Sequence, residues 1–186
     1  KKERDTIVYA SKKTTYDTFD PAVDPAHDLR QAIVEDDERN LILVGPPGTG
    51  KTHMALDIAD ELSEEIFFFQ FHESYSYEDF VESYEPVFKN GDIKGFEPVE
   101  KGFLKACKEA SKKSDDEYIF VVLDEINRAN VSRVFGELFS LIEYRDKVDD
   151  PKINQHTLYS GNKITIPNNL VIVGTMNNVD KSTEDL

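Results

Sequence analysis

The octapeptide Gly45-Pro-Pro-Gly-Thr-Gly-Lys-Thr52 constrains the fold of this chain more than any other feature. It follows the apolar run Leu41–Val44, which predicts a buried strand, and it precedes Met54–Leu62, whose apolar residues recur at helical spacing. A loop of the pattern GxxxxGK[ST] between a strand and a helix lets backbone N–H groups surround phosphates at the positive end of the helix. The sequence therefore predicts a phosphate-binding loop.

Apolar runs and helical spacings alternate along the rest of the chain. Buried strands are expected at Ile66–Phe71, Tyr118–Leu123 and Leu170–Thr175. Helices are expected at Val23–Ile33, Phe103–Ala110 and Val131–Ile142, the last as one helix with Asn130 as its N-cap. This alternation favours an α/β fold of three layers around a parallel sheet.

The domain organisation follows from the same patterns. Residues 1–20 are polar and aperiodic, so we expect a lead-in arm, and residues 21–186 are expected to form one nucleotide-binding core. Lys163–Ile166 is expected to form one arm of a small hairpin, with Ser160–Asn162 as its turn.

Composition excludes several classes of function. The net charge of −15 repels DNA phosphates, so this segment is a poor candidate for the main DNA-binding surface. No apolar run approaches the roughly 20 residues that span a bilayer, which argues against a membrane protein. The lone Cys107 lies on an apolar helix face and is expected in the core, and such cysteine usage fits a reducing cytoplasm.

An acidic pair supplies the second half of the expected site. Asp124 and Glu125 directly follow the apolar run Tyr118–Leu123 and should lie at the carboxyl end of its strand, where ligands of parallel sheets bind. We expect Asp124 and the Thr52 hydroxyl to hold Mg²⁺, and Glu125 to deprotonate the attacking water. Lys51 should reach the β- and γ-phosphates. The nucleotide-binding residues expected around it are Gly45, Pro46, Pro47, Gly48, Thr49, Gly50, Lys51, Thr52 and His53.

Longer stretches of the chain resemble the McrB family, the GTP-hydrolysing AAA+ motor subunits of modification-dependent restriction systems. The resemblance is carried by Gly45–Thr52, Phe71–Phe80, Asp124–Asn130 and Met176–Ser182, in the family's order. The chain departs from the family pattern MNTADRS at Asn178, Val179 and Lys181. Replacing the arginine by Lys181 loses a planar five-donor fork.

The resemblance implies a function and a set of partners. It implies Mg²⁺-dependent hydrolysis of GTP, with Asn177 contacting the γ-phosphate or the lytic water. It also implies a hexameric ring, an McrC-like nuclease subunit, and contact with DNA through a domain outside this chain. Arg128 is a candidate for the subunit interface and Asp180 for an interface or signature residue. The family's helical lid and arginine-rich segment would fall beyond Leu186.

Other interpretations remain open at the level of sequence. A MoxR-like AAA+ ATPase that remodels proteins would share the sequence around Asp124, and it would prefer ATP. A nucleotide-gated assembly module would bind without hydrolysis. We reject a guanine-reading role for Asn177–Asp180, because the preceding strand should lie beside the phosphate-loop strand and so face the γ-phosphate. The four histidines show no metal-ligand spacing, and Arg133 is expected in solvent. The DNA modification and the nuclease partner stay undetermined.

Overall fold

The computed structural model describes residues 8–10, 25–145 and 154–177. These residues form two compact units. The first contains the described residues up to Phe71, together with Phe120–Asn127 and the residues from Val171 onward. The second contains His72–Ile119 and the described part of Arg128–Leu170. In the described part of the chain, no helix is long and apolar enough to cross a membrane.

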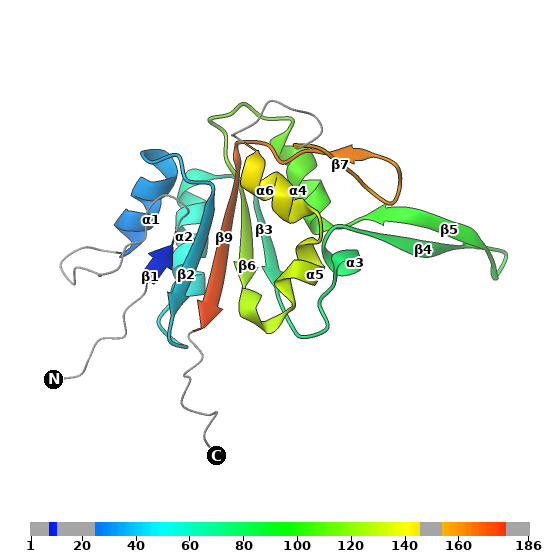
Figure 1. Cartoon of the computed structure of the whole chain (residues 1–186), viewed down its shortest axis with the longest axis horizontal. Coiled ribbons are helices and arrows are strands. Elements are labelled where there is room, and N and C mark those ends of the chain that lie inside the picture. Colours follow the sequence, from blue (N-terminus) through cyan, green and yellow to red (C-terminus); the bar gives the residue numbers. More distant parts are fainter. Residues whose placement is uncertain (1–7, 11–24, 146–153, 178–186) are drawn as a thin grey trace, which may run out of the picture. The chain divides into compact units, whose positions relative to one another are not determined.

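A five-stranded sheet forms the centre of the first unit (Figure 1). Its order is β1 (Val8–Ala10), β2 (Asn40–Gly45), β9 (Leu170–Asn177), β6 (Ile119–Asp124) and β3 (Ile66–Gln70). β2 pairs with β9 and β3 with β6 in parallel, whereas β1 pairs antiparallel with β2. The arrows of β9 and β6 point the same way in Figure 1. Four strands therefore end at one edge of the sheet, and the expected strand beside the phosphate loop is confirmed as β9.

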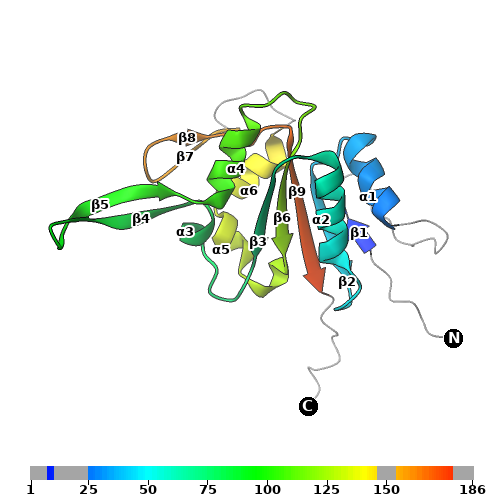
Figure 2. The same cartoon turned by 180° about the vertical axis from the view of Figure 1, so that it is seen from behind.

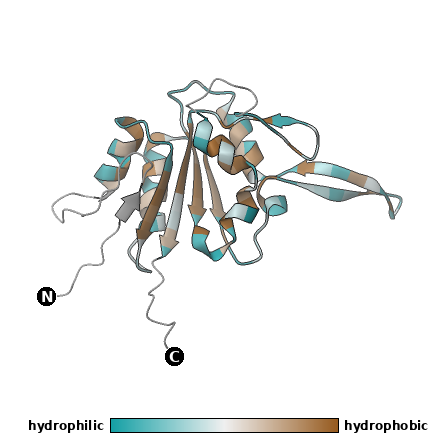
Figure 3. Cartoon of the chain, in the orientation of Figure 1, coloured by the Kyte–Doolittle hydropathy of each residue, from teal (hydrophilic) through white to brown (hydrophobic). Residues whose placement is uncertain are grey.

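Burial of the central strands explains their sequences. Every residue of β6 is buried, as are Leu170–Thr175 of β9, and the apolar parts of these strands are brown in Figure 3. Parallel strands covered on both faces read as continuous apolar runs. Each fully buried Val, Ile or Leu contributes about 1.5–3 kcal/mol relative to an exposed position. The parallel sheet predicted from the sequence is confirmed.

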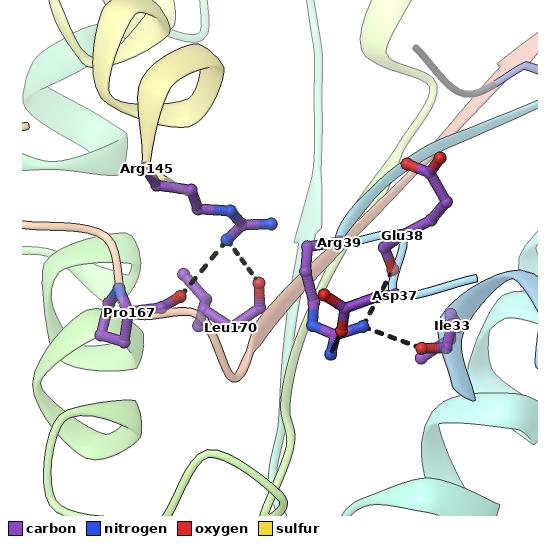
Figure 4. A network of polar contacts seen from close by, with 7 residues as sticks. All are labelled: Ile33, Asp37, Glu38, Arg39, Arg145, Pro167 and Leu170. Carbon is purple, nitrogen blue, oxygen red and sulfur yellow. Dashed lines mark hydrogen bonds and ion pairs between the residues drawn. The ribbon is translucent and has the colours of Figure 1, made fainter. Parts of the chain in front are cut away.

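The described residues of the first unit include the helices α1 (Pro25–Val34) and α2 (Lys51–Leu62). Figure 2 shows α2 in front of the sheet. The turn that leads from α1 into β2 is held by the Arg39 guanidinium, which donates to the Ile33 carbonyl over 2.8 Å and pairs with Asp37 (Figure 4). This contact fixes the start of the strand that delivers the phosphate loop.

The second unit contains short helices and two hairpins. A 3₁₀ turn at Ile126–Arg128 stands where the chain passes from the first unit into the second. The elements of the second unit are α3 (Tyr77–Phe80), β4 (Glu82–Lys89), β5 (Asp92–Glu100), α4 (Gly102–Ala110), α5 (Val131–Phe135), α6 (Leu138–Tyr144), β7 (His156–Thr157) and β8 (Lys163–Ile164).

Aromatic packing forms the core of the second unit. The ring of Phe80 stacks on Phe103 at a centroid distance of 4.7 Å and meets Phe135 edge-on at 5.1 Å. The guanidinium of Arg145 donates to the carbonyls of Leu170 and Pro167, over 2.7 and 3.4 Å (Figure 4). The ring contacts join α3, α4 and α5, and the Arg145 hydrogen bonds connect the end of α6 to Pro167 and Leu170.

A buried asparagine closes the loop after α4. The Asn169 side-chain nitrogen lies 3.0–3.1 Å from the carbonyls of Ala110, Ser114 and Glu117. The backbone carbonyl of Asn169 accepts a hydrogen bond from the Ile119 amide at 3.0 Å. Asn169 thereby sets the point at which the chain enters β6.

The structure corrects one predicted helix and adds one hairpin. Residues Val131–Ile142, predicted as one helix, lie in the two helices α5 and α6. Gly136 has φ +52°, and this backbone conformation ends α5 before α6 begins. Asn130 caps α5 as predicted, its side chain accepting from the Arg133 amide. The small hairpin around residues 160–162 is confirmed as β7 and β8. The β4–β5 hairpin was not predicted, and its large apolar side chains Tyr84, Phe88, Ile93 and Phe96 are exposed.

Candidate nucleotide site

The phosphate loop connects β2 to α2 at the carboxyl edge of the sheet. Gly48 has φ +79° and Gly50 has φ +85°. Residues that have a side chain adopt this left-handed backbone region only at a cost in free energy, whereas glycine does not. No atom lies within 4 Å of where a Cβ on either glycine would stand, so the loop leaves open space along its backbone. Gly50 is the N-cap of α2 and makes no side-chain cap, and the first turn of α2 carries no acidic residue. The geometry suits an anion at this helix end.

Lys51 opens α2 and is buried, with 6% of its surface exposed. Its ammonium donates to the carbonyls of Gly45 and Pro46 over 2.8 and 2.7 Å, and to the Asn177 side-chain oxygen over 2.9 Å. Burial lowers the pKa of Lys51 from its ordinary value, and the nearby Asp124 carboxylate acts in the opposite direction. The ammonium is thus a partly desolvated cation held at the phosphate loop.

The acidic pair lies at the end of β6, as expected. Asp124 Oδ1 accepts hydrogen bonds from the Thr52 hydroxyl at 2.6 Å and from the Thr175 hydroxyl at 2.8 Å. Glu125 has φ +54°, in the left-handed region, which costs a non-glycine residue about 1–3 kcal/mol. The turn at Glu125 redirects the chain away from the strand axis, so the two carboxylates of the pair have different partners.

Asn177 connects the lysine to the acidic pair. It pairs with Gly45 in the β2–β9 ladder, which places it beside the start of the phosphate loop. Its side-chain oxygen accepts from Lys51, and its side-chain nitrogen donates to Glu125 Oε1 over 3.0 Å. Its backbone carbonyl accepts from the side chain of Asn127 over 3.3 Å. The three residues predicted as catalytic, Lys51, Glu125 and Asn177, therefore form one hydrogen-bonded chain.

Thr175 belongs to this hydrogen-bond network but was not predicted from the sequence as a site residue. It lies two positions before Asn177 on β9, and side chains two apart on a strand share a face. A polar residue two positions after the apolar run Leu170–Val173, on the same face as Asn177, is the signal that points to it. Its hydroxyl is buried and contacts both members of the acidic pair.

The donor set fits a magnesium nucleotide. The loop backbone, the α2 N-terminus and the Lys51 ammonium suit phosphate oxygens, and the Thr52 hydroxyl and Asp124 carboxylate converge within 2.6 Å of each other. Residues 8–10, 25–145 and 154–177 contain no cluster of three or more His, Cys, Asp or Glu that could hold a metal ion alone. Mg²⁺ needs no such cluster, because one or two protein oxygens, substrate phosphates and waters commonly complete its octahedron.

The other predicted site residues are not part of the hydrogen-bond network of Lys51, Asn177 and Glu125 as described above, or they lie outside the described residues. His53 is exposed on the first turn of α2, and Arg128 is exposed at the end of the 3₁₀ turn. Arg133 is exposed on α5, as expected. Asp180 lies outside the described residues. Cys107 is buried as predicted, and burial raises the pKa of its thiol to about 12.

The sheet order, the phosphate loop and the acidic pair define a P-loop protein of the AAA class. The family model of the AAA domain, dynein-related subfamily, matches residues 40–186, and the chain belongs to this family. The fold class expected from the sequence, an AAA+ P-loop core with a parallel sheet, is confirmed.

Within this class the chain is similar to restriction-enzyme subunits. It is 35% identical over 185 residues to the type IV methyl-directed restriction enzyme EcoKMcrB subunit of Escherichia coli strain K12; this match covers 95% of this chain and 38% of that protein. It is 29% identical over 178 residues to the type II restriction enzyme BsuMI component YdiS of Bacillus subtilis strain 168, covering 77% of this chain and 52% of that protein. The resemblance to the McrB family is confirmed, and the chain spans about half or less of each relative's length.

Proposed function

We propose that this chain binds Mg²⁺-GTP at the phosphate loop and hydrolyses it, as the motor domain of a DNA restriction complex. The observation that carries the proposal is the chain of hydrogen bonds from Lys51 through Asn177 to Glu125. It joins the cation expected at the γ-phosphate to the carboxylate expected to activate water. A protein that only bound nucleotide would need the lysine, but it would not need a carboxylate aligned with it.

Each residue of the network has a separate role in this proposal. The loop amides and Lys51 bind the phosphates, and Thr52 with Asp124 holds Mg²⁺, which would neutralise charge on the β- and γ-phosphates. Glu125 accepts a proton from the attacking water, while the amide of Asn177 orients both the Glu125 carboxylate and the γ-phosphate. The electrostatic effect of the site is strengthened by its burial among β2, β6 and β9.

The preference for GTP rests on the similarity to McrB-type subunits and not on a guanine-reading residue. Competition between GTP and ATP for the purified protein tests it directly. Turnover of GTP at concentrations where ATP is not used supports the restriction motor. The reverse preference favours a MoxR-like ATPase.

The remaining parts of the proposal concern assembly. We place the chain in a cytoplasmic hexameric ring that drives an McrC-like nuclease, with DNA bound through another part of the complex. The two restriction-enzyme relatives support this context. The charge of −15 supports the assignment of DNA contact elsewhere. Sedimentation of the intact gene product with and without GTP tests the ring, and DNA cleavage after addition of the nuclease subunit tests the partner.

Glu125→Gln is the variant that separates binding from hydrolysis. Glutamine keeps the size and the hydrogen bond to Asn177 but removes the base. In the intact gene product we expect GTP and Mg²⁺ binding to persist while turnover falls by roughly 10²-fold or more. The matched control is Glu64→Gln, which makes the same charge change at an exposed position after α2.

Phosphate release and binding of a fluorescent GTP analogue are the two measurements. Near-normal turnover in Glu125→Gln would show that another group activates the water. Tight binding without turnover in the wild-type protein, whatever partner is added, would show a nucleotide-gated assembly module instead.

A further inference from the structure

The buried hydroxyl of Thr175 contacts both residues of the acidic pair. It lies on the central strand β9 with 1% of the residue exposed. It donates its single hydrogen to Asp124 Oδ1 over 2.8 Å, and it accepts a hydrogen bond from the Glu125 amide over 3.0 Å. Burying a hydroxyl costs free energy unless it is hydrogen-bonded. Here the Thr175 hydroxyl both donates and accepts a hydrogen bond, and its two partners are the acidic residues at the end of β6.

The contact with Asp124 fixes the direction of a carboxylate. Asp124 Oδ1 receives one hydroxyl from Thr52 at the start of α2 and a second from Thr175 on the neighbouring strand. Two donors on one oxygen restrict rotation of the carboxylate about its Cβ–Cγ bond. Removing the Thr175 hydroxyl would leave Thr52 as its remaining donor in this network, and Thr52 is itself expected to bind Mg²⁺.

The contact with Glu125 supports an unfavourable backbone conformation. Glu125 has φ +54°, which non-glycine residues seldom adopt without an external constraint. The Thr175 oxygen accepts from the amide of this residue and so helps to hold the turn. That turn directs the Glu125 side chain to Asn177, two residues beyond Thr175 on the same strand.

We propose that Thr175 is a positioning residue of the nucleotide site, whose hydroxyl aligns the magnesium-side carboxylate of Asp124 and the backbone of the general base Glu125. The inference rests on the proposed function, but it concerns a residue to which neither the phosphate-loop motif nor the acidic-pair motif gives a role. Thr175 acts through the Asp124 carboxylate and the Glu125 backbone amide, so its role is to position these two residues.

Thr175→Val tests the hydroxyl, because valine has nearly the same shape and lacks the donor and acceptor. In the intact gene product we expect kcat to fall about 10- to 100-fold, the range typical for residues that orient metal ligands. KM for the magnesium nucleotide should rise as well, because Asp124 would hold Mg²⁺ less well, whereas the contacts of the loop amides and Lys51 with the phosphates remain. Thr175→Ser keeps the hydroxyl and should restore kcat. Thr157→Val, at an exposed position on β7, is the matched control.

A binding measurement separates this inference from the proposed function. Affinity for a fluorescent non-hydrolysable nucleotide is measured in Mg²⁺ and in EDTA. Thr175→Val should weaken binding about 10- to 100-fold in Mg²⁺ and leave it unchanged in EDTA, since its effect passes through Asp124. This readout holds even if the wild-type protein shows no turnover, an outcome that would refute the proposed hydrolysis alone.

Two results would overturn the positioning role. One is wild-type kcat and Mg²⁺-dependent affinity in Thr175→Val. The other is equal impairment of the serine and valine variants, which would assign the effect to packing of the methyl group. If the valine variant does not fold, as judged by its thermal unfolding, Thr175→Cys replaces it. Cysteine is close in size to serine but a weak hydrogen-bonding group, so the cysteine variant should be impaired and the serine variant active.

Discussion

Replacing Lys51 by alanine removes a side chain that contacts both the phosphate loop and the end of β9. In the structure the ammonium donates to Gly45, Pro46 and Asn177, all within 2.9 Å. Alanine preserves the helix, since it has the highest helix propensity. The substitution therefore tests the charge and its hydrogen bonds with little change in backbone structure.

The magnitude follows from the number of bonds that the ammonium can transfer to phosphate. A hydrogen bond to a charged group contributes about 1.5–3 kcal/mol, so two bonds to phosphate oxygens contribute about 3–6 kcal/mol. At about 1.4 kcal/mol per factor of ten, nucleotide affinity should fall by roughly 10²- to 10⁴-fold. Stability without nucleotide should change much less. Burial lowers the pKa of Lys51, so removing the ammonium also removes a desolvated charge, which offsets the lost hydrogen bonds.

Titration with a fluorescent GTP analogue, together with thermal unfolding of the nucleotide-free protein, checks both parts. Lys105→Ala removes the same charge from an exposed position on α4 and should leave affinity unchanged. Unaltered affinity in Lys51→Ala would remove Gly45–Thr52 from the binding site. A large loss of stability in parallel with the loss of affinity would show that Lys51 acts through folding, and the reasoning from phosphate contacts would be wrong.

Two further predictions concern the second unit. Asn169→Asp should destabilise the protein by about 3–5 kcal/mol at neutral pH, because a carboxylate would face the carbonyls of Ala110, Ser114 and Glu117. Those carbonyls raise the pKa of the new carboxyl in the folded state, so the loss of stability should become smaller as the pH falls. Urea unfolding at several pH values measures this loss, and Asn90→Asp at an exposed position is the control. Equal stability of Asn169→Asp and the wild-type protein would contradict the prediction. Cys107, whose thiol pKa is raised to about 12 by burial, should resist iodoacetamide in the native protein at pH 8 and react after unfolding. Mass spectrometry follows the labelling, and rapid native modification would contradict the buried placement.

Local signals were sufficient to predict much of the first unit and its site. The phosphate loop and the acidic pair each follow a buried strand, and both patterns depend on residues close together in the chain. The proximity of Asn177 to Lys51 needed one topological inference, that the last strand lies beside β2, and the register Gly45↔Asn177 bears this out. The spacing along β9 places Thr175 on the same face as Asn177, but its hydrogen bonds to Asp124 and Glu125 join residues about 50 positions apart, and local sequence patterns do not predict them.

Predictions in the second unit were less complete for two physical reasons. The apolar spacing over Val131–Ile142 continues across Gly136, so periodicity alone does not show that the backbone there has positive φ. The β4–β5 hairpin carries its large apolar side chains, such as Phe88 and Phe96, in exposed positions, and Pro86 lies within β4. A proline and the absence of a buried face both weaken the usual strand signal.

The position of β9 has a consequence for how the protein folds during synthesis. β9 is the last described strand in the chain, yet it lies between β2 and β6 in the sheet. Until it leaves the ribosome, β2 and β6 lack the strand that separates them in the finished sheet, and only the pairs β1–β2 and β3–β6 of the described sheet can form. Long-range strand pairing of this kind is slow and exposes aggregation-prone edges. The described sheet therefore cannot be completed, and Asn177 cannot bond to Lys51 and Glu125, before residues 170–177 have been synthesised.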